Sequence, residues 1–335
     1  MKTSARSLLL LLCLALASRA RAEPREIRAA QQYGLSYLAL MLMEDGHLVE
    51  KHAKALGLGD LKVTWAKLGG PQAMNDALLS GSLDFGTGGV PSLNTLWSKT
   101  KGTPSAVKGV GALNDMPNEL IVSRPEVKSI RDLGPQDKIA VTSVKIATQA
   151  LLLEMAAAKE WGDDQYEKLD ALTVSLSHPD AMTALLSKSG AITGHFASPP
   201  FSFQEKARPP LRSILSSYDI LGGPATFNVV WSTSRFHDQN PKAYAAFVAA
   251  FEEANAAIIK DKRGAAETYK RMTRTTETLD ELMKMMNDPS ITFTLTPHRI
   301  LKTAAFMHKT GRIKNAPQGW QELFFDNLKD REGGS

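Results

Sequence analysis

Short strand-like segments and longer helix-like segments alternate along the chain from Ile27 to about Val230. The strand-like segments, in which apolar residues alternate or form short runs, are residues 27–33, 61–68, 83–88, 106–113, 119–124, 138–143, 171–176 and 191–196. Most are followed by a stretch with apolar residues at helical spacing, such as 35–56 and 146–161. Alternating strands and helices predict mostly parallel sheets with helices on both faces.

The pattern changes after Ser232, where only helical spacing remains. Residues 240–260 place Tyr244, Phe247 and Phe251 on one face, as an amphipathic helix on a core requires. Further helices are predicted in segments 264–273, 278–286, 297–311 and 319–329. The sequence therefore predicts a helical C-terminal tail that buries its apolar faces on the preceding part of the chain.

Turn-forming segments at 114–117 and 221–224 indicate where the chain passes between two lobes. A chain of 335 residues is longer than a single small core usually covers. We predict lobe I from residues 23–115 and 225–335, and lobe II from residues 116–224. The alternative, two lobes in succession joined by one linker, stays open from the sequence alone.

Residues 1–22 have the pattern of a secretory signal peptide. Lys2 and Arg6 precede an apolar run over 8–17, and the segment ends in the small-x-small pattern 20–22. Cleavage near Ala22 predicts a periplasmic protein. Loss of this leader lowers the net charge from +5 to +1, which removes the main support for nucleic-acid binding. It also removes Cys13, the only cysteine, and with it thiol chemistry and disulfides.

The motifs of several enzyme classes are missing. The glycine-rich stretch 81–91 lacks the Lys-Ser/Thr of a phosphate loop, and Pro91 occupies the last glycine position of a dinucleotide fingerprint. No G-x-S-x-G hydrolase motif occurs. None of the seven histidines forms an HxH or HExxH pair, so we expect neither a metal nor a cofactor.

Glycine, serine and proline gather where predicted strands end and helices begin. The segments are 33–37, 68–72, 86–92, 142–143 and 178–179. Ligands of open α/β sheets bind beyond the carboxyl ends of the strands, where the free amides of helix N-termini attract anions. These segments therefore predict a cleft for an anion or a strongly polar group. The competing interpretation, ordinary connections between strands and helices, applies to any one segment taken alone.

Four blocks of the sequence resemble the nitrate/sulfonate/taurine-type substrate-binding proteins of ABC importers. They are residues 33–57, 67–93, 129–153 and 180–201, and the most specific is "ALLSGSLDFG" at 77–86. The resemblance extends over about residues 25 to 325. It implies an α/β, two-lobed periplasmic-binding-protein (Venus flytrap) fold, class II-like, with mixed sheets flanked by helices and a helical C-terminal tail. It also implies a monomer that delivers a small-molecule ligand to an ABC permease and its ATPase.

The resemblance also implies which residues contact the ligand. Carried over by position, these are Gly34, Leu35, Ser36, Gly69, Gly70, Gly88, Gly89, Ser143, Lys145, His195, Thr226 and Asn228. Tyr33 joins them because it lies in the first loop. The solutes of the family include alkanesulfonates, taurine, nitrate, bicarbonate and pyrimidine precursors of thiamine. No arginine lies in these loops, so a bidentate guanidinium clamp on a sulfonate is not indicated.

Besides a binding protein for a pyrimidine precursor, two other functions stay open at this point. One is an enzyme on the same fold acting on a small pyrimidine or sulfur compound, with His195 and Lys67 or Lys145 as its candidate groups. The other is a sensor that presents the same two-lobed body to a membrane kinase. The absence of a catalytic motif favours a binding protein without enzymatic activity.

Overall fold

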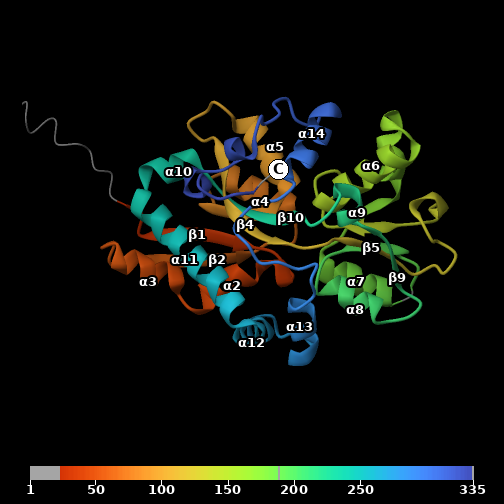
Figure 1. Ribbon diagram of the computed structural model, residues 1–335, viewed down its shortest axis with the longest axis horizontal. Helices are drawn as coiled ribbons and strands as arrows, with labels where there is room; N and C mark the ends of the chain where they lie inside the picture. The colour runs from red at the N-terminus through yellow and green to blue at the C-terminus, as the bar shows by residue number, and fades with distance from the viewer. Residues whose placement is uncertain (1–22, 188, 334–335) are drawn as a thin grey trace, which may run out of the picture.

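The structure is a computed structural model that describes residues 23–187 and 189–333. It contains two five-stranded sheets that lie side by side along the long axis of the molecule (Figure 1). The first has the order β2-β1-β3-β10-β4, with β1 (Glu26–Gln31), β2 (Lys62–Lys67), β3 (Phe85–Gly89), β4 (Val107–Asp115) and β10 (Thr226–Thr233). Strand β10 runs antiparallel to both of its neighbours, so the sheet is mixed.

The second sheet is also mixed. Its order is β7-β6-β8-β5-β9, with β5 (Glu119–Val122), β6 (Ile139–Val141), β7 (Thr173–Ser175), β8 (Gly194–Ala197) and β9 (Arg212–Ser216). Strand β5 pairs antiparallel with β8 and β9, whereas β6 is parallel to β7 and β8. This sheet is not all parallel because β5, the first strand after the crossing from the first sheet, runs opposite to both of its neighbours.

Helices cover both faces of the first sheet. One face carries α2 (Leu38–Asp45), α3 (Leu48–Ala55), α11 (Pro241–Lys260), α12 (Lys262–Thr273) and α13 (Leu279–Met286), with α10 (Ser234–Gln239) beside them. The other face carries α4 (Pro71–Leu79), α5 (Val90–Thr100) and α14 (Ile300–Lys309). The predicted amphipathic helix is α11, and its Phe247 stacks on Phe85 of β3 with ring centroids 3.6 Å apart.

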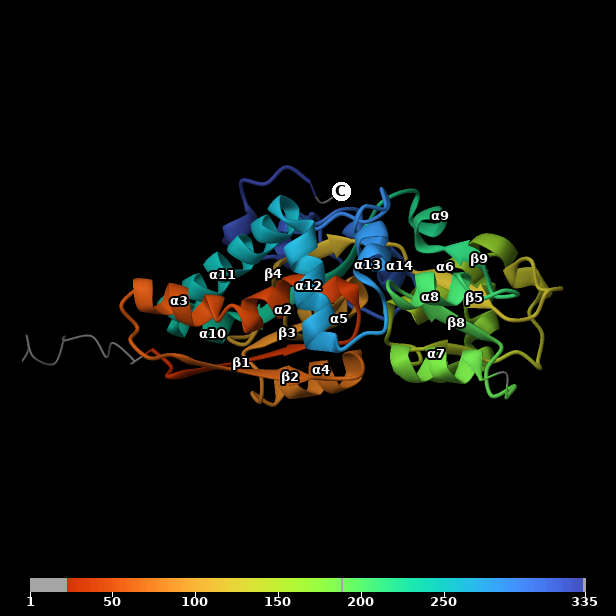
Figure 2. The same cartoon turned by 90° about the horizontal axis from the view of Figure 1, so that it is seen from below.

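Helices also cover both faces of the second sheet. Successive strand residues point to opposite sides, so neighbouring residues of β5 meet different helices. Leu120 and Val122 face α6 (Thr148–Trp161) and α9 (Ser217–Leu221). Ile121 faces α7 (His178–Leu186) and α8 (Phe201–Lys206). Figure 2 shows α7 and α8 beside the second sheet and α4 beside the first, with the C-terminal helices α13 and α14 near the junction.

The chain passes between the two sheets twice, after β4 and before β10. The expected mixed sheets and two-lobed arrangement are therefore present, while the lobe boundaries at 115/116 and 224/225 stay a prediction. The predicted signal peptide, residues 1–22, lies outside the described residues. Within residues 23–187 and 189–333, no helix combines the length and the apolar character that crossing a membrane requires.

Two sequence-based expectations about elements are wrong. Segment 35–56 is not one helix, because His47 adopts a left-handed backbone conformation with φ 47° and separates α2 from α3. Segment 319–329 forms two short 3-10 turns, and Phe324 between them pairs with Gly109 of β4. A Cβ at position 109 would collide with the Phe324 ring, so glycine is needed for this contact. The tail is thus not wholly helical.

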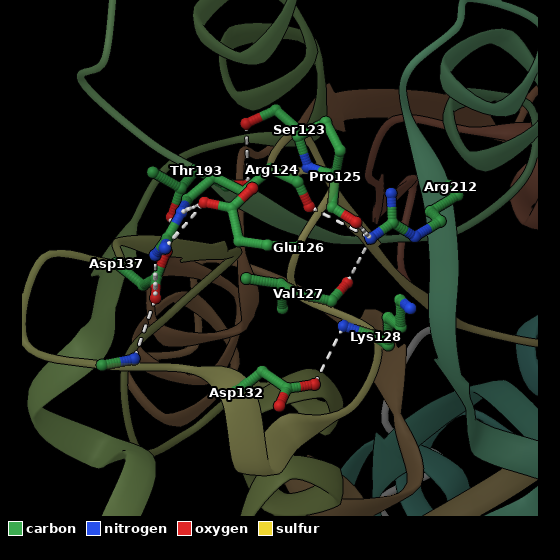
Figure 3. A network of polar contacts seen from close by, with 11 residues as sticks. Ser123, Arg124, Pro125, Glu126, Val127, Lys128, Asp132, Asp137, Thr193 and Arg212 are labelled. Carbon is green, nitrogen blue, oxygen red and sulfur yellow. Dashed lines mark hydrogen bonds and ion pairs between the residues drawn. The ribbon is translucent and has the colours of Figure 1, made fainter.

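The proline-rich stretch after β8 holds α8 and β9, which the sequence pattern did not reveal. Strand β9 is held at the sheet edge by Arg212, whose guanidinium donates to backbone carbonyls within residues 124–127 (Figure 3). In the same network, Arg124 donates to both carboxylate oxygens of Asp137 at 2.9 Å, and Thr193 donates to one of them. Burial acts to raise the pKa of Asp137, but a hydrogen bond from the backbone amide of Gly134, together with those from Arg124 and Thr193, lowers it below its ordinary value.

Candidate functional site

A cavity lies between the loops of the two sheets. From the side of the first sheet it is lined by Gln32, Tyr33, Tyr37, Gly69, Pro71, Gly89, Ser92, Phe227 and Asn228. From the side of the second sheet it is lined by Thr142, Ala147, Thr148, Gln149, His178 and Ser198. Residues of both lobes therefore line one cavity.

The cavity is narrow. The space free of protein atoms amounts to about 420 Å³ when the opening toward solvent is included. The enclosed part amounts to about 20 Å³, which is room for about one water molecule. The volume of the enclosed part limits the size of a ligand. In this arrangement of the lobes the cavity has no room for a solute larger than water.

Four helices begin at the cavity. Helices α4 and α5 begin at Pro71 and Val90, and α6 and α7 begin at Thr148 and His178. The first amides of a helix lack intrahelical partners and carry partial positive charge. None of the described residues that line the cavity is Lys, Arg, Asp or Glu. The site thus combines amides, hydroxyls and carboxamides with helix dipoles, which suits a small anion.

Glycines let the two lobes touch around the cavity. A Cβ at Gly70 would lie 2.7 Å from the carbonyl oxygen of Thr142, and a Cβ at Gly89 would overlap Oγ1 of Thr148. The backbone amide of Leu35 also donates to the carbonyl of Pro199 in the other lobe, at 3.1 Å. The structure is therefore a closed arrangement in which bare backbone from lobe I meets lobe II.

A buried polar network orients Asn228 on the side of lobe I. The Asn228 carboxamide donates to Oγ of Ser36 at 2.7 Å, and Ser36 donates to Oδ1 of Asn114 at 3.1 Å. The Asn114 amide donates in turn to the Ser36 carbonyl at 2.7 Å. All three side chains are at least 99% buried, so the network fixes the rotamer of Asn228 at the cavity wall.

A second buried network extends from the cavity into lobe II. Nε2 of His178 lies 3.3 Å from Oγ of Ser198, and Nδ1 of His178 lies 2.8 Å from Nε2 of His195. Nδ1 of His195 lies 2.6 Å from Oε1 of Glu205 on α8. Burial lowers the pKa of His195 to about 3 and raises that of Glu205 to about 9. Burial, followed by the neighbouring His195, also places the pKa of His178 well below its ordinary value.

The residues predicted from the sequence fall into three groups. Those that line the cavity are Tyr33, Gly69, Gly89 and Asn228. Those directly behind its wall are Gly34, Leu35, Ser36, Gly70, Gly88 and His195. The third group, which is not among the lining residues, is Ser143, Lys145 and Thr226. Lys145 and Thr226 bond elsewhere, and the Ser143 carbonyl accepts from amides of its own turn.

Lys145 and Thr226 show what these positions do instead. The Lys145 side chain is 61% exposed and lies 3.9 Å from Glu167, while its carbonyl accepts from Arg312. Oγ1 of Thr226 donates to Asp115 at 3.1 Å within lobe I. Gly88 packs against Trp231 and Gln32 of its own lobe. Their contact with a ligand stays a prediction.

Several lining residues were not singled out from the sequence as ligand contacts. They are Gln32, Tyr37, Pro71, Ser92, Thr142, Ala147, Thr148, Gln149, His178, Ser198 and Phe227. The strand-end signal did place Tyr37, Pro71, Ser92, Thr142 and His178 in the segments predicted to form the cleft, although none of them was named as a ligand contact. Gln149 and Ser198 gave no such signal, since their places depend on how the second lobe packs.

The order and the directions of the strands identify the fold. This is the two-lobed periplasmic-binding-protein fold, which confirms the architecture that the resemblance implied. The structure is similar to the alkanesulfonate-binding protein SsuA from Xanthomonas axonopodis pv. citri bound to MOPS, with a TM-score of 0.68 and 18% identity. That match covers 89% of this chain and 96% of the other.

Two further solved structures are similar. One is the periplasmic aliphatic sulphonate-binding protein SsuA from Escherichia coli, with a TM-score of 0.66, 16% identity, and coverage of 92% of this chain and 100% of the other. The other is the periplasmic nitrate-binding protein NrtA from Synechocystis, with a TM-score of 0.64, 16% identity, and coverage of 87% and 82%. At these identities the similarity establishes the fold. No protein-family profile matches the chain. No curated protein sequence matches it either.

Proposed function

We propose that this protein is an extracytoplasmic solute-binding protein that captures a small polar anion between its two lobes and delivers it to an ABC permease and its ATPase. The observation that carries the proposal is the convergence of four helix N-termini from both lobes on one cavity. The solutes of the similar structures, sulfonates and nitrate, are the ligand class that we assign to this chain.

Capture depends on opening and closing of the lobes. The enclosed space holds about one water molecule, so the anion enters an open form and then bonds to both lobes. Such a ligand stabilises the closed form by as much as its affinity for the two forms differs. The direct contact of Gly70 and Gly89 with lobe II makes closure a well-defined end point.

The remaining parts of the proposal follow from this role. We propose a periplasmic monomer whose leader is removed near Ala22, without catalytic activity, cofactor or nucleic-acid partner. Among the described residues, no group of three His, Cys, Asp or Glu side chains is placed to hold a metal ion. Delivery to a permease, rather than presentation to a sensor kinase, is the role favoured by similar structures that are described as parts of an ABC-type import system and of a sulfonate ABC transporter.

A thermal-unfolding screen tests this proposal. The purified secreted protein is heated with nitrate, methanesulfonate, taurine, bicarbonate, acetate and a neutral pyrimidine. An anion present at 100 times its dissociation constant adds about 2.7 kcal/mol of apparent stability, which raises the melting temperature by several degrees.

A variant locates the effect. Gly89→Val introduces a side chain that overlaps Thr148 of the other lobe, so the shift caused by the anion should disappear while the variant still unfolds cooperatively. If no anion raises the melting temperature of the wild type, the solute-binding proposal is wrong. If Gly89→Val keeps the full shift, the ligand does not bind in this cleft.

A further inference from the structure

One buried group of ionisable residues has no role in the closure described so far. His178, His195 and Glu205 are each at least 94% buried, and they form a continuous chain from the cavity wall to helix α8. Each comes from a different element, α7, β8 and α8. The His178 ring also stacks on Phe201, with ring centroids 5.3 Å apart, so the ring is held in place.

The hydrogen bonds of this chain have one of two directions. If Glu205 is a carboxylate, His195 donates to it from Nδ1 and His178 donates to His195, which leaves Nε2 of His178 as an acceptor at the cavity. If Glu205 is protonated, it donates to Nδ1 of His195, and His195 donates from Nε2 to Nδ1 of His178. Nε2 of His178 then carries a proton that points toward the cavity.

The surroundings of Glu205 favour the second direction. Its Oε2 is fully buried and has no hydrogen-bond partner among the described residues. A carboxylate would leave a charged oxygen unsatisfied there, whereas a protonated acid leaves only a neutral carbonyl oxygen. Burial, opposed only by Arg208, raises the pKa of Glu205 to about 9, in agreement with this geometry.

Charged groups on the elements around the chain are engaged elsewhere. On α7, Asp180 accepts from Ser177, and on α8, Lys206 pairs with Glu119 of β5. Arg208, after α8, donates to a backbone carbonyl, and Arg212 of β9 donates to the loop at 124–127. Glu154, on α6, is bound by Arg312. Within residues 23–187 and 189–333, none of these groups hydrogen-bonds to His178, His195 or Glu205.

Gln149 does not oppose this direction. Its Nε2 lies 3.4 Å from Nε2 of His178, but the same amide donates to Oδ1 of Asn118 at 3.2 Å. It therefore has an acceptor without the imidazole. The single Nε2 proton of His178 has the hydroxyl of Ser198, 3.3 Å away, as its acceptor in this structure, and a ligand oxygen in the cavity would share or replace that contact.

We propose that the chain Glu205–His195–His178 holds a proton at Nε2 of His178 for the bound anion, and that loss of this proton switches the cavity from donating to accepting. The inference rests on the proposed function. It requires that the bound ligand places an acceptor oxygen against Nε2 of His178. On deprotonation, His178 gives its Nε2 proton to solvent, His195 passes its proton to Nδ1 of His178, and Glu205 passes its proton to His195. One proton leaves, and Glu205 becomes a carboxylate.

The same direction argues against nucleophilic catalysis at Ser198. A serine nucleophile needs an imidazole with a free lone pair to take its proton. With Nε2 of His178 protonated, the imidazole donates to Ser198 instead. The chain therefore recognises a ligand and does not activate the hydroxyl.

Binding as a function of pH tests the proposal. The dissociation constants of nitrate and methanesulfonate are measured by calorimetry from pH 6 to 10. For the wild type we expect constant affinity up to about pH 9, and a loss of about tenfold per pH unit above it. The neutral probe methanesulfonamide, whose N–H group can donate to an unprotonated Nε2, should show a smaller loss.

Two carboxyl-to-amide variants make the test specific. In Glu205→Gln the amide keeps donating to His195, so binding should persist at pH 10 with the affinity seen at pH 7. Glu119→Gln removes a carboxylate from the same sheet without touching the chain, and should follow the wild type. A pH-independent wild type overturns the proposal, and so does a Glu205→Gln profile that matches the wild type.

A measurement without ligand separates this proposal from the proposed function. Nitrogen-15 NMR shifts of the imidazoles, assigned with the variants His178→Gln and His195→Gln, report which ring nitrogen carries the proton. We expect both rings protonated at Nε2 at pH 7. A His178 ring protonated at Nδ1 overturns the proton chain whether or not an anion binds. Failure of every anion to bind, with both rings protonated at Nε2, refutes only the solute-binding function.

Discussion

At the scale of single residues, Gly69 and Gly70 of the cleft differ in how much room they leave for a side chain. A Cβ at Gly70 would lie 2.7 Å from the Thr142 carbonyl, a backbone atom that cannot move aside. A Cβ at Gly69 would meet only Cβ of Ser177 at 3.9 Å, which is an ordinary contact. Neither glycine has a positive φ, so neither needs glycine for its backbone conformation. The requirement at Gly70 comes from closure of the lobes.

This difference predicts unequal effects of the same substitution. Gly70→Ala should weaken anion affinity by at least about fivefold, because overpacking of this kind costs about 1–3 kcal/mol in the closed form. Gly69→Ala is the matched control and should weaken binding less. Calorimetric titration of both variants, with unfolding curves to confirm their folds, measures this. Equal affinities would show that the Gly70–Thr142 contact does not limit closure.

At the scale of elements, helix α14 connects the lobes from behind the cleft. Ala304 and Met307 of α14 pack with Leu151 of α6 and with Ile313. The guanidinium of Arg312 donates to the buried carboxyl of Glu154 on α6. Burial is the largest influence on the pKa of Glu154 and, against the opposing charge of Arg312 and together with Asp170, raises it to about 8.

A raised carboxyl pKa makes stability depend on pH in a defined direction. The folded protein holds the Glu154 proton up to about pH 8, whereas the unfolded chain releases it near pH 4.3. This contribution to the free energy of unfolding is therefore full at low pH and is lost as the pH rises toward 8. Between pH 5.5 and 8, Glu154→Gln should lose less stability than the wild type, by up to about 3 kcal/mol. Urea unfolding at the two pH values measures this, and equal losses would contradict it.

At the scale of the whole molecule, the sequence predicted the architecture better than the site. Periodicity and turn chemistry indicated alternating strands and helices, because these elements depend on the local pattern of residues. The resemblance indicated the two-lobed fold. Strand β9 and helix α8 were missed because they are short and lie next to prolines. The break at His47 was missed because a single left-handed residue leaves the apolar spacing unchanged.

The site was only partly predictable, for a physical reason. Gly69, Gly89 and Asn228 lie at strand ends, so a rule about strand ends finds them. His178 and Glu205 come together with His195 only because α7 and α8 pack on the same face of the second sheet. Such a chain has no signature in sequence spacing. Lys145 sits in a loop that the rule selects, but its side chain turns to solvent.

The central claim is that a small anion closes the two lobes on each other. The secreted form that we propose has lost Cys13 with its leader, so spin labels can be attached at Ala73→Cys on α4 and Thr183→Cys on α7, both exposed positions on helices that begin at the cleft. Pulsed electron–electron double resonance then measures the distance between the labels with and without saturating methanesulfonate or nitrate. The account predicts longer and more varied distances without the anion, and a narrow, shorter distance matching this structure with it. A distribution that stays the same when the bound anion saturates the protein would contradict it.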